Sequence, residues 1–390
     1  MENTTPQSSI DTLTTLSALM VIGTLGISIF MILPAIAIAM MEDLGRSEQQ
    51  VGVVGFAGLI GIACGSILNL VLVKRLALRR LAYLGLLGML VVDLGTLFVD
   101  SHNLFVATRF VSGLAGGIAV SFAAYALGKT SHADRNFGWF LVIQVSFGIL
   151  ALLALPPIIT PFGIDGVFAT LCIIHLMALL FLAPMIPNIL PNSERDASRT
   201  NSALIWKFCA TVLLAVLCFY MAIGGFWTYI GPIGIDAGLS GEATSTALGV
   251  GLGGGLGGAY AAAALNIRFG RIPPVVCAIG LQLTALLILS SGFGLASFTV
   301  AAVMFSFGWY MYFPYMMGLL AALDRDGRSI VIANVCAGAG SGLGPLFAAA
   351  FLSDGFAPTY LICFTFLLTS ASFTIATAAL SRRHLKGTSA

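Results

Sequence analysis

One arginine of this 390-residue chain stands inside a long apolar run. Arg109 begins the stretch RFVSGLAGG, residues 109–117, within the run 103–128. If this run crosses a membrane, the charge costs about 2.5–3.5 kcal/mol at the bilayer centre, and ionisable residues found there are functional by default. We therefore expect Arg109 to face a cavity, where it binds an anionic substrate or takes part in proton coupling. The alternative is a structural residue that bonds neighbouring helices.

Two further ionisable residues in apolar runs are candidates for proton chemistry. Asp93 lies seven residues before Asp100, and Arg109 lies seven residues after His102. An antiparallel hairpin would place Asp93 and Arg109 at similar depth, so a salt bridge is plausible. Asp93 would then either carry a proton or only hold Arg109 in place. His175 titrates in a range that suits a proton relay, but we favour a hydrogen-bonded packing role for it.

Aromatic side chains gather in two other runs, in FYMAIGGFWTY (219–229) and FGWYMYFPY (307–315). Tryptophan and tyrosine usually mark membrane interfaces, but Trp309, Tyr310 and Tyr312 lie deeper than an interface requires. We therefore expect some aromatic contact with a substrate. The candidates for substrate contact are Tyr220, Trp227, Trp309, Tyr310 and Tyr312, with Gln144 and Asn334 as polar candidates.

Two glycine patterns predict close packing of helices. GVGLGGGLGG (249–258) contains a formal G-x-G-x-x-G, but a dinucleotide site needs a strand before it and a helix after it. Here the pattern lies inside an apolar run, so it indicates helix packing or a bend. Gly113 and Gly117 follow Arg109 at i+4 and i+8 and form a bare stripe, which lets another helix approach.

The composition requires a lipid environment for most of the chain. Hydrophobic residues make up 58% and charged residues 9%, against about 25% charged in soluble domains. A membrane helix needs roughly 20 apolar residues, and barrel strands would alternate in polarity. We therefore predict an all-α membrane protein with twelve transmembrane helices. The apolar runs are 13–41, 50–73, 79–99, 103–128, 135–160, 164–187, 205–230, 243–266, 272–292, 296–322, 328–352 and 358–381.

The basic residues predict the orientation. Sixteen of the 18 lysines and arginines fall in alternate loops, Arg46 is on the opposite side, and Arg109 is in a run. The positive-inside rule then places both termini and the 188–204 linker in the cytoplasm, in a membrane expected to be a bacterial inner membrane. The first twelve residues lack lysine and arginine, so the first run is expected to be a retained span and not a signal peptide.

The linker divides the chain into two similar halves, a six-helix bundle at 1–187 and another at 205–390. Arg75 and Arg268 follow corresponding runs and are 193 residues apart, and the same offset separates Arg135 and Arg328. Duplicated halves are common in transporters, with the substrate site between them near the midplane. At this offset Arg109 corresponds to Ala302, and Asp93 corresponds to Leu286.

These features together resemble the major facilitator superfamily. VKRLALRR (73–80) and NIRFGRIP (266–273) are similar to its basic loop motif, at Arg75, Arg268, Gly270 and Arg271. RFVSGLAGG resembles its fourth-helix motif R-x-x-x-G-x-x-x-G, and ILPAIAIAMMEDLGRSEQQVG (32–52) resembles the helix 1–2 region of drug and sugar efflux members. The resemblance implies that helices 1, 4, 7 and 10 line the cavity. Helices 3 and 6, which carry Asp93 and His175, would lie outside it.

One antiporter feature of that family is absent from its expected place. Span 5 reads VSFGILALLALPP and lacks the G-x-x-x-G-P motif, while a similar GSGLGP (340–345) stands in span 11. The seven cysteines show no CxxC spacing, so neither a disulfide framework nor a zinc site is expected.

The expected function is secondary transport. The sequence has no P-loop, nucleophile–base pair or metal cluster, so we predict a transporter driven by an ion gradient and not an enzyme. The leading hypothesis is proton-coupled efflux of a small amphipathic compound or metabolite by alternating access. The alternatives are proton-coupled uptake of an organic anion gripped by Arg109, and an uncoupled facilitator or sensor. We expect a monomer in the lipid bilayer that binds a small-molecule substrate and protons, with no cofactor, metal or nucleic acid.

Overall fold

The computed structural model describes residues 10–131, 133–190, 203–265, 267–292, 294–323, 328–351 and 355–387, and the regular structure within them is helical, with no strand. The chain divides into two compact units, Met1–Glu194 and Arg195–Ala390. Their boundary falls within the predicted linker. Residues 191–202 of that linker, including Arg199, and Asn266 of the second loop motif lie outside the described residues.

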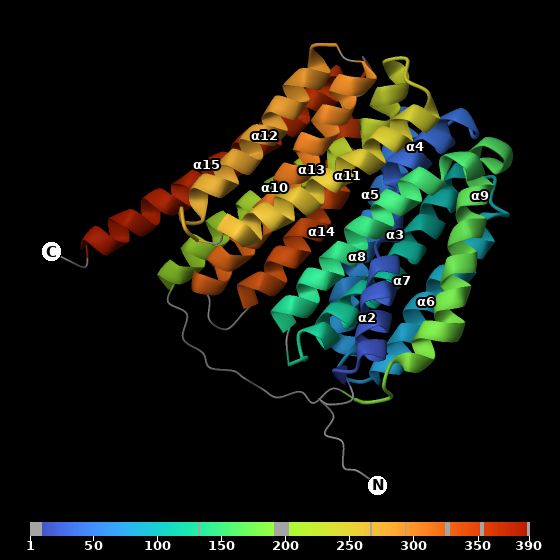
Figure 1. The fold of residues 1–390 in the computed structure, drawn as a ribbon, viewed down its shortest axis with the longest axis horizontal. Coiled ribbons are helices and arrows are strands. Elements are labelled where there is room, and N and C mark those ends of the chain that lie inside the picture. The colour runs from blue at the N-terminus through green and yellow to red at the C-terminus, as the bar shows by residue number, and fades with distance from the viewer. Residues whose placement is uncertain are drawn as a thin grey trace, which may run out of the picture. The chain divides into compact units, whose positions relative to one another are not determined.

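The first unit contains the helices of the predicted spans 1–6 (Figure 1). The first span is in three pieces, and the sixth ends in a π turn and a 3-10 turn. The elements are α2 (Leu13–Leu25), α3 (Ser28–Met31), α4 (Leu33–Glu42), α5 (Glu48–Leu72), α6 (Leu78–Thr96), α7 (His102–Leu127), α8 (Ala133–Ala154), α9 (Pro156–Met177), η1 (Ala178–Leu182) and η2 (Ala183–Met185).

The second unit contains the helices of spans 7–12. They are α10 (Ala203–Asp236), α11 (Gly241–Leu265), α12 (Ile272–Ser290), α13 (Leu295–Leu323), α14 (Arg328–Ala349) and α15 (Ala357–Gly387).

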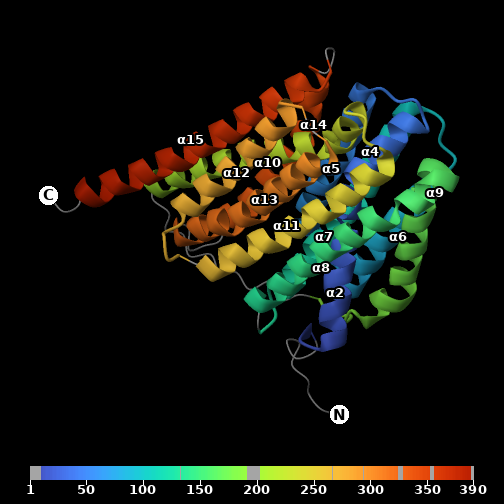
Figure 2. The ribbon, with the colours of Figure 1, turned by 45° about the horizontal axis from the view of Figure 1, so that its top comes forward.

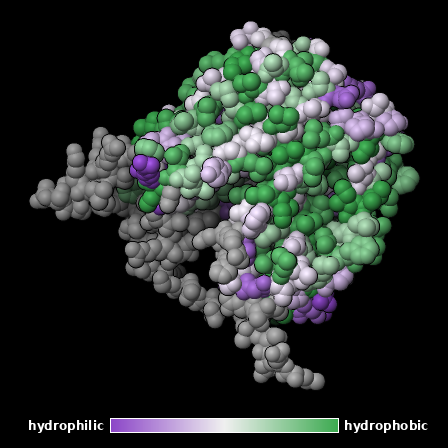
Figure 3. All heavy atoms as spheres, viewed as in Figure 1, coloured by the Kyte–Doolittle hydropathy of each residue, from purple (hydrophilic) through white to green (hydrophobic). Residues whose placement is uncertain are grey.

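Ten helices in the described part of the chain are long and apolar enough to cross a membrane. The other two spans, the first and the third, do not meet this criterion of length and polarity. The first is divided into shorter apolar helices, and α6 includes three charged residues, Arg79, Arg80 and Asp93. Apolar side chains also cover much of the face in Figure 3, where a soluble protein would expose polar groups. The chain is therefore a multi-pass integral membrane protein with an all-α, twelve-span fold.

Two breaks separate spans 5 and 6, and the sequence predicted one of them. The apolar run continues to residue 160, but α8 ends at Ala154 and a new helix begins at Pro156. Proline is favoured in the first turn of a helix, where its missing N–H is not needed. The chain bends again at Gly163, whose φ of 58° suits glycine. The gap between the predicted runs, 161–163, contains Gly163, whereas hydrophobicity could not locate the break at Leu155, because the residues around it are uniformly apolar.

Glycines set the closest helix contacts in both units, as their patterns predicted. A Cβ on Gly61 or Gly65 of α5 would collide with the carbonyl oxygens of Phe110 or Leu114 in α7. A Cβ on Gly254 or Gly258 of α11 would likewise collide with those of Val303 or Phe307 in α13. Each pair in the second unit lies 193 residues after its counterpart in the first. The structural repeat therefore follows the same offset as the basic loops.

Candidate functional site

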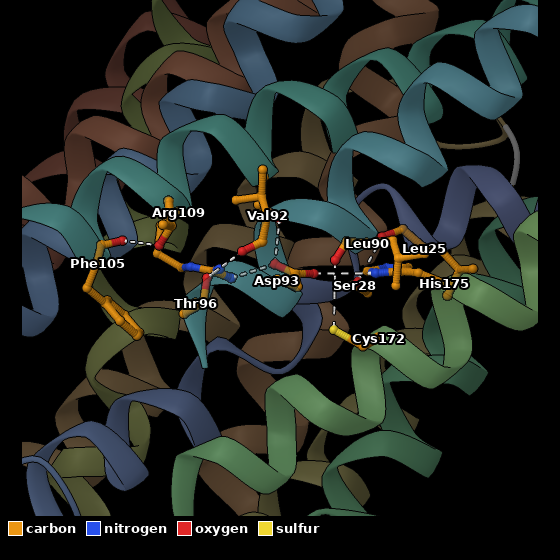
Figure 4. Close-up of polar contacts among 12 residues, drawn as sticks. Leu25, Ser28, Leu90, Val92, Asp93, Thr96, Phe105, Arg109, Cys172 and His175 are labelled. Atoms are coloured by element: carbon orange, nitrogen blue, oxygen red, sulfur yellow. Dashed lines mark hydrogen bonds and ion pairs between the residues drawn. The ribbon is translucent and has the colours of Figure 1, made fainter. Parts of the chain in front are cut away.

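Three helices of the first unit bring Asp93, Arg109 and His175 together (Figure 4). Arg109 Nη1 lies 3.0 Å from Asp93 Oδ1, so the ion pair that the hairpin suggested is present. His175 Nδ1 lies 3.4 Å from Asp93 Oδ2. All three residues are at most 3% exposed. The helices that carry them are in contact, since α6 packs on both α7 and α9, and Figures 1 and 2 show α6 and α9 side by side.

The negative charge of Asp93 lies at a position that disfavours an anion. It lies in the last turn of α6, which ends at Thr96, and a helix C-terminus carries partial negative charge that disfavours an anion. Ser112 Oγ donates a hydrogen bond of 2.9 Å to Asp93 Oδ1. Arg109 supplies the opposite charge and also donates from Nη2 to Thr96 Oγ1. The guanidinium thus connects α7 to two positions in the last turn of α6.

Aromatic rings enclose the guanidinium. Its Cζ lies 4.3 Å from the ring centroid of Phe168 and 5.6 Å from that of Phe105. The two rings pack edge to face at 5.8 Å. A cation over an aromatic face is stabilised by the ring quadrupole, more so when it is desolvated. In this conformation Arg109 is bound by its own unit and is only 3% exposed.

His175 is the residue whose partner could not be found from sequence. We favoured a packing role, and the structure places the imidazole against the Asp93 carboxylate with 1% of its surface exposed. Its Nε2 has no hydrogen-bond partner among the described residues. The contact results from the packing of the third span on the sixth, and no spacing within the sequence reveals that packing.

The candidate aromatic residues separate into buried and partly exposed groups. Tyr312 is fully buried, stacks on Phe219 with ring centroids 3.5 Å apart, and its hydroxyl lies 3.2 Å from Ser370 Oγ. Trp227 and Trp309 are also buried, with their rings 5.9 Å apart. These three side chains pack the interior of the second unit. Tyr220 and Tyr310 are partly exposed, so they remain the aromatic candidates for substrate contact.

The remaining candidates lie elsewhere in their units. Gln144 is buried in α8, and Asn334 is exposed on α14; neither contributes to the contacts of Asp93.

The basic loop motifs are surface features. Arg75 and Arg268 are exposed, and Arg268 Cζ lies 5.8 Å from the ring centroid of Phe269. Gly270 has φ +75°, a conformation that other residues rarely adopt. Arg271 is half-buried, and a Cβ on Gly318 of α13 would lie 3.3 Å from its Nε.

Two nearby tyrosines of α13 should respond differently to truncation. Tyr312→Ala should lower the melting temperature strongly, since removing a buried aromatic ring costs about 3–5 kcal/mol. Tyr310→Ala should leave folded yield near wild type and raise the apparent KM for substrate. Fluorescence-detected thermal melting and transport kinetics measure the two effects. Equal destabilisation by both changes would make Tyr310 a packing residue too.

The described residues contain no cluster of three or more metal-ligating side chains. The fold and site instead define a class of protein, a polytopic helical membrane protein with a buried charge cluster in one of two repeated bundles. The sequence model of the Major Facilitator Superfamily matches residues 18–345. The chain belongs to this family, whose members are transporters.

Solved structures share this fold at low sequence identity. The crystal structure of a mutant form of the nucleoside transporter NupG is 10% identical with a TM-score of 0.71, and the match covers 94% of this chain and 99% of that one. A bacterial homologue of the human lysosomal transporter Spinster, in an inward-facing and unoccupied conformation, is 13% identical with a TM-score of 0.66, covering 94% and 95% of the two chains. A sequence comparison with curated proteins gives no match. These likenesses establish the fold and leave the substrate open.

Proposed function

We propose that this protein is a proton-coupled secondary transporter that exports a small amphipathic compound by alternating access. The observation that carries the proposal is the buried Asp93–Arg109 pair. The repeat supplies an internal comparison, because the corresponding positions of the second unit, Leu286 and Ala302, are apolar and buried. Buried ion pairs are often replaced by apolar residues without loss of stability. The packing of this repeat therefore does not require the charges, which supports a role for them in transport.

The partly exposed aromatic residues support the proposed substrate class. Tyr220 and Tyr310 each present a ring with a hydroxyl group, which suits a compound with both apolar and polar parts. Export rests on the resemblance of residues 32–52 to efflux proteins. The basic loops support a bacterial inner membrane with both termini in the cytoplasm. Uptake of an organic anion is less favoured, because the guanidinium of Arg109 is already paired and enclosed.

Proton movement caused by a substrate tests this proposal directly. Purified protein is reconstituted into liposomes that contain the pH indicator pyranine, and a panel of aromatic amphipathic compounds, including ethidium and chloramphenicol, is added outside. We expect at least one compound to change the internal pH at a rate above that of protein-free liposomes. The same compound should inhibit growth more strongly in cells that lack the protein than in cells that produce it.

Two results would contradict the proposal. Exchange of a panel compound across the membrane without proton movement would identify an uncoupled facilitator. Greater growth inhibition in cells that produce the protein would indicate uptake.

A further inference from the structure

We infer that Asp93 and His175 form a shared site for one proton, which a water molecule reaches beside the break in the first span. This inference rests on the proposed function and deepens it by naming the groups that hold the proton. The two carboxylate oxygens of Asp93 have different partners. Oδ1 is occupied by Arg109 and Ser112, whereas Oδ2 faces His175 Nδ1 at 3.4 Å. One oxygen is thus held by the guanidinium, and the other faces an imidazole, a group that can bind or release a proton.

A small cavity adjoins both Asp93 and His175. It has a volume of about 10 Å³ and is lined in part by Asp93, Ser112 and His175, which is close to the smallest volume that holds one water. The unpartnered Nε2 of His175 is a buried polar atom, and such atoms are normally satisfied by protein or by water. The polar lining and the volume together fit a single water molecule.

Gly26 and Ser28 of the first span also line this cavity. The helix is interrupted here, because α2 ends at Leu25, α3 begins at Ser28, and Ile27 has φ −116° and ψ 10°. Irregular backbone at membrane depth is tolerated where it is buried in protein or lines a watery cavity. The interrupted segment therefore lines the same cavity as Asp93 and His175.

The charges around the site allow one additional proton. The ionisable groups that act on Asp93 are Arg109 on α7 and His175 on α9, with Cys172 on α9 adjacent to the pair. Cys172 Sγ contacts the carbonyl oxygen of Leu90 at 3.9 Å. With a neutral imidazole, the charges of Asp93 and Arg109 cancel. One proton raises the net charge to +1 whether it resides on the carboxylate or on the imidazole, and a second proton would add a further uncompensated charge.

His175→Asn tests how transport depends on the proton shared by Asp93 and His175. The asparagine amide occupies about the position of Nδ1 and can donate to Asp93, but it cannot take up a proton. The proton must then bind the carboxylate directly beside Arg109, which favours the ionised form. We expect proton-driven flux to reach half its maximum at a pH about one unit or more below that of wild type. His102→Asn, at the start of α7 in the same unit, is the matched control and should leave this pH unchanged.

Nuclear magnetic resonance of histidine provides a test that does not depend on transport. The chain has only four histidines, so the ¹⁵N signal of His175 is assigned by its loss in His175→Asn or His175→Gln. We expect this signal to report the binding of the shared proton in wild-type protein held in lipid nanodiscs. In Asp93→Asn the response of this signal to pH should change, because the carboxylate that shares the proton with the imidazole is gone.

The two measurements separate this inference from the proposed function. A His175 signal that stays in one protonation state from pH 5 to 8 in the wild type overturns the shared site, even if transport is proton-coupled. So does an unchanged pH profile in folded His175→Asn. A coupled titration of His175 and Asp93 in a protein that moves no protons with any substrate would support the site and refute the proposed function.

Discussion

Arg109→Ala should abolish proton-driven transport. The change removes the cation from Asp93 Oδ1 and from Thr96 in one step, and a buried ion pair that loses one partner is destabilised by about 3–5 kcal/mol. Arg109→Lys should restore the activity only partly, because one ammonium group lacks the forked geometry that reaches two acceptors at once. Flux driven by a pH gradient in proteoliposomes, normalised to folded protein, measures both variants.

Controls separate the loss of coupling from the loss of folding. Arg46→Ala removes an arginine that donates a 2.9 Å hydrogen bond to the carbonyl oxygen of Asp100 at the surface, and it should retain wild-type flux. The double variant Arg109→Gln with Asp93→Asn removes both charges and should regain folded yield relative to Arg109→Ala without regaining coupling. Wild-type flux from Arg109→Ala would make the arginine a structural residue.

Gly117→Ala should reduce the amount of folded protein sharply. A Cβ at this position would collide with the carbonyl oxygen of Ile62 and lie 2.9 Å from the backbone nitrogen of Ser66, both in α5. Backbone atoms cannot move aside as a flexible side chain does, and overpacking costs about 1–3 kcal/mol or more. Size-exclusion profiles and thermal melting in detergent measure the loss.

Gly95→Ala is the matched change in a neighbouring helix. It adds the same methyl group to α6, where nothing lies within 4 Å of the new atom. Because alanine has a higher helix propensity than glycine by up to about 1 kcal/mol, this variant should be as stable as the wild type or more stable. Similar melting temperatures for the two variants would show that α5 and α7 are less closely packed than the structure indicates.

The fold could be predicted because lipid imposes simple rules on a sequence. Backbone groups in the hydrocarbon must be paired within helices, so apolar runs of sufficient length specify the spans almost directly. The offset between Arg75 and Arg268 likewise reflected a repeat that reappears in the glycine contacts. The break at Leu155 escaped prediction, since it depends on backbone conformation within a run that is uniformly apolar. The break at Gly163 lies in the gap between the predicted runs 135–160 and 164–187.

The candidate site could be predicted only in part. The Asp93–Arg109 contact joins helices connected by a short turn, so the sequence positions restrict it. His175 reaches the same carboxylate from 82 positions further along the chain, and only the packing of α6 against α9 specifies that contact. Burial of Tyr312 and partial exposure of Tyr310 are also tertiary properties, because one periodic aromatic run contains both.

Asp93→Asn gives the most direct test of the proposal that this buried charge cluster couples protons to transport. The measurement compares two activities of the same proteoliposomes, exchange of a panel compound at equal pH on both sides and its accumulation against a gradient when a pH difference is imposed. Asparagine keeps the shape of the side chain and loses its charge. We predict that exchange is retained and that pH-driven accumulation is lost. Accumulation at the wild-type level, in a variant with wild-type folded yield, would contradict the proposal.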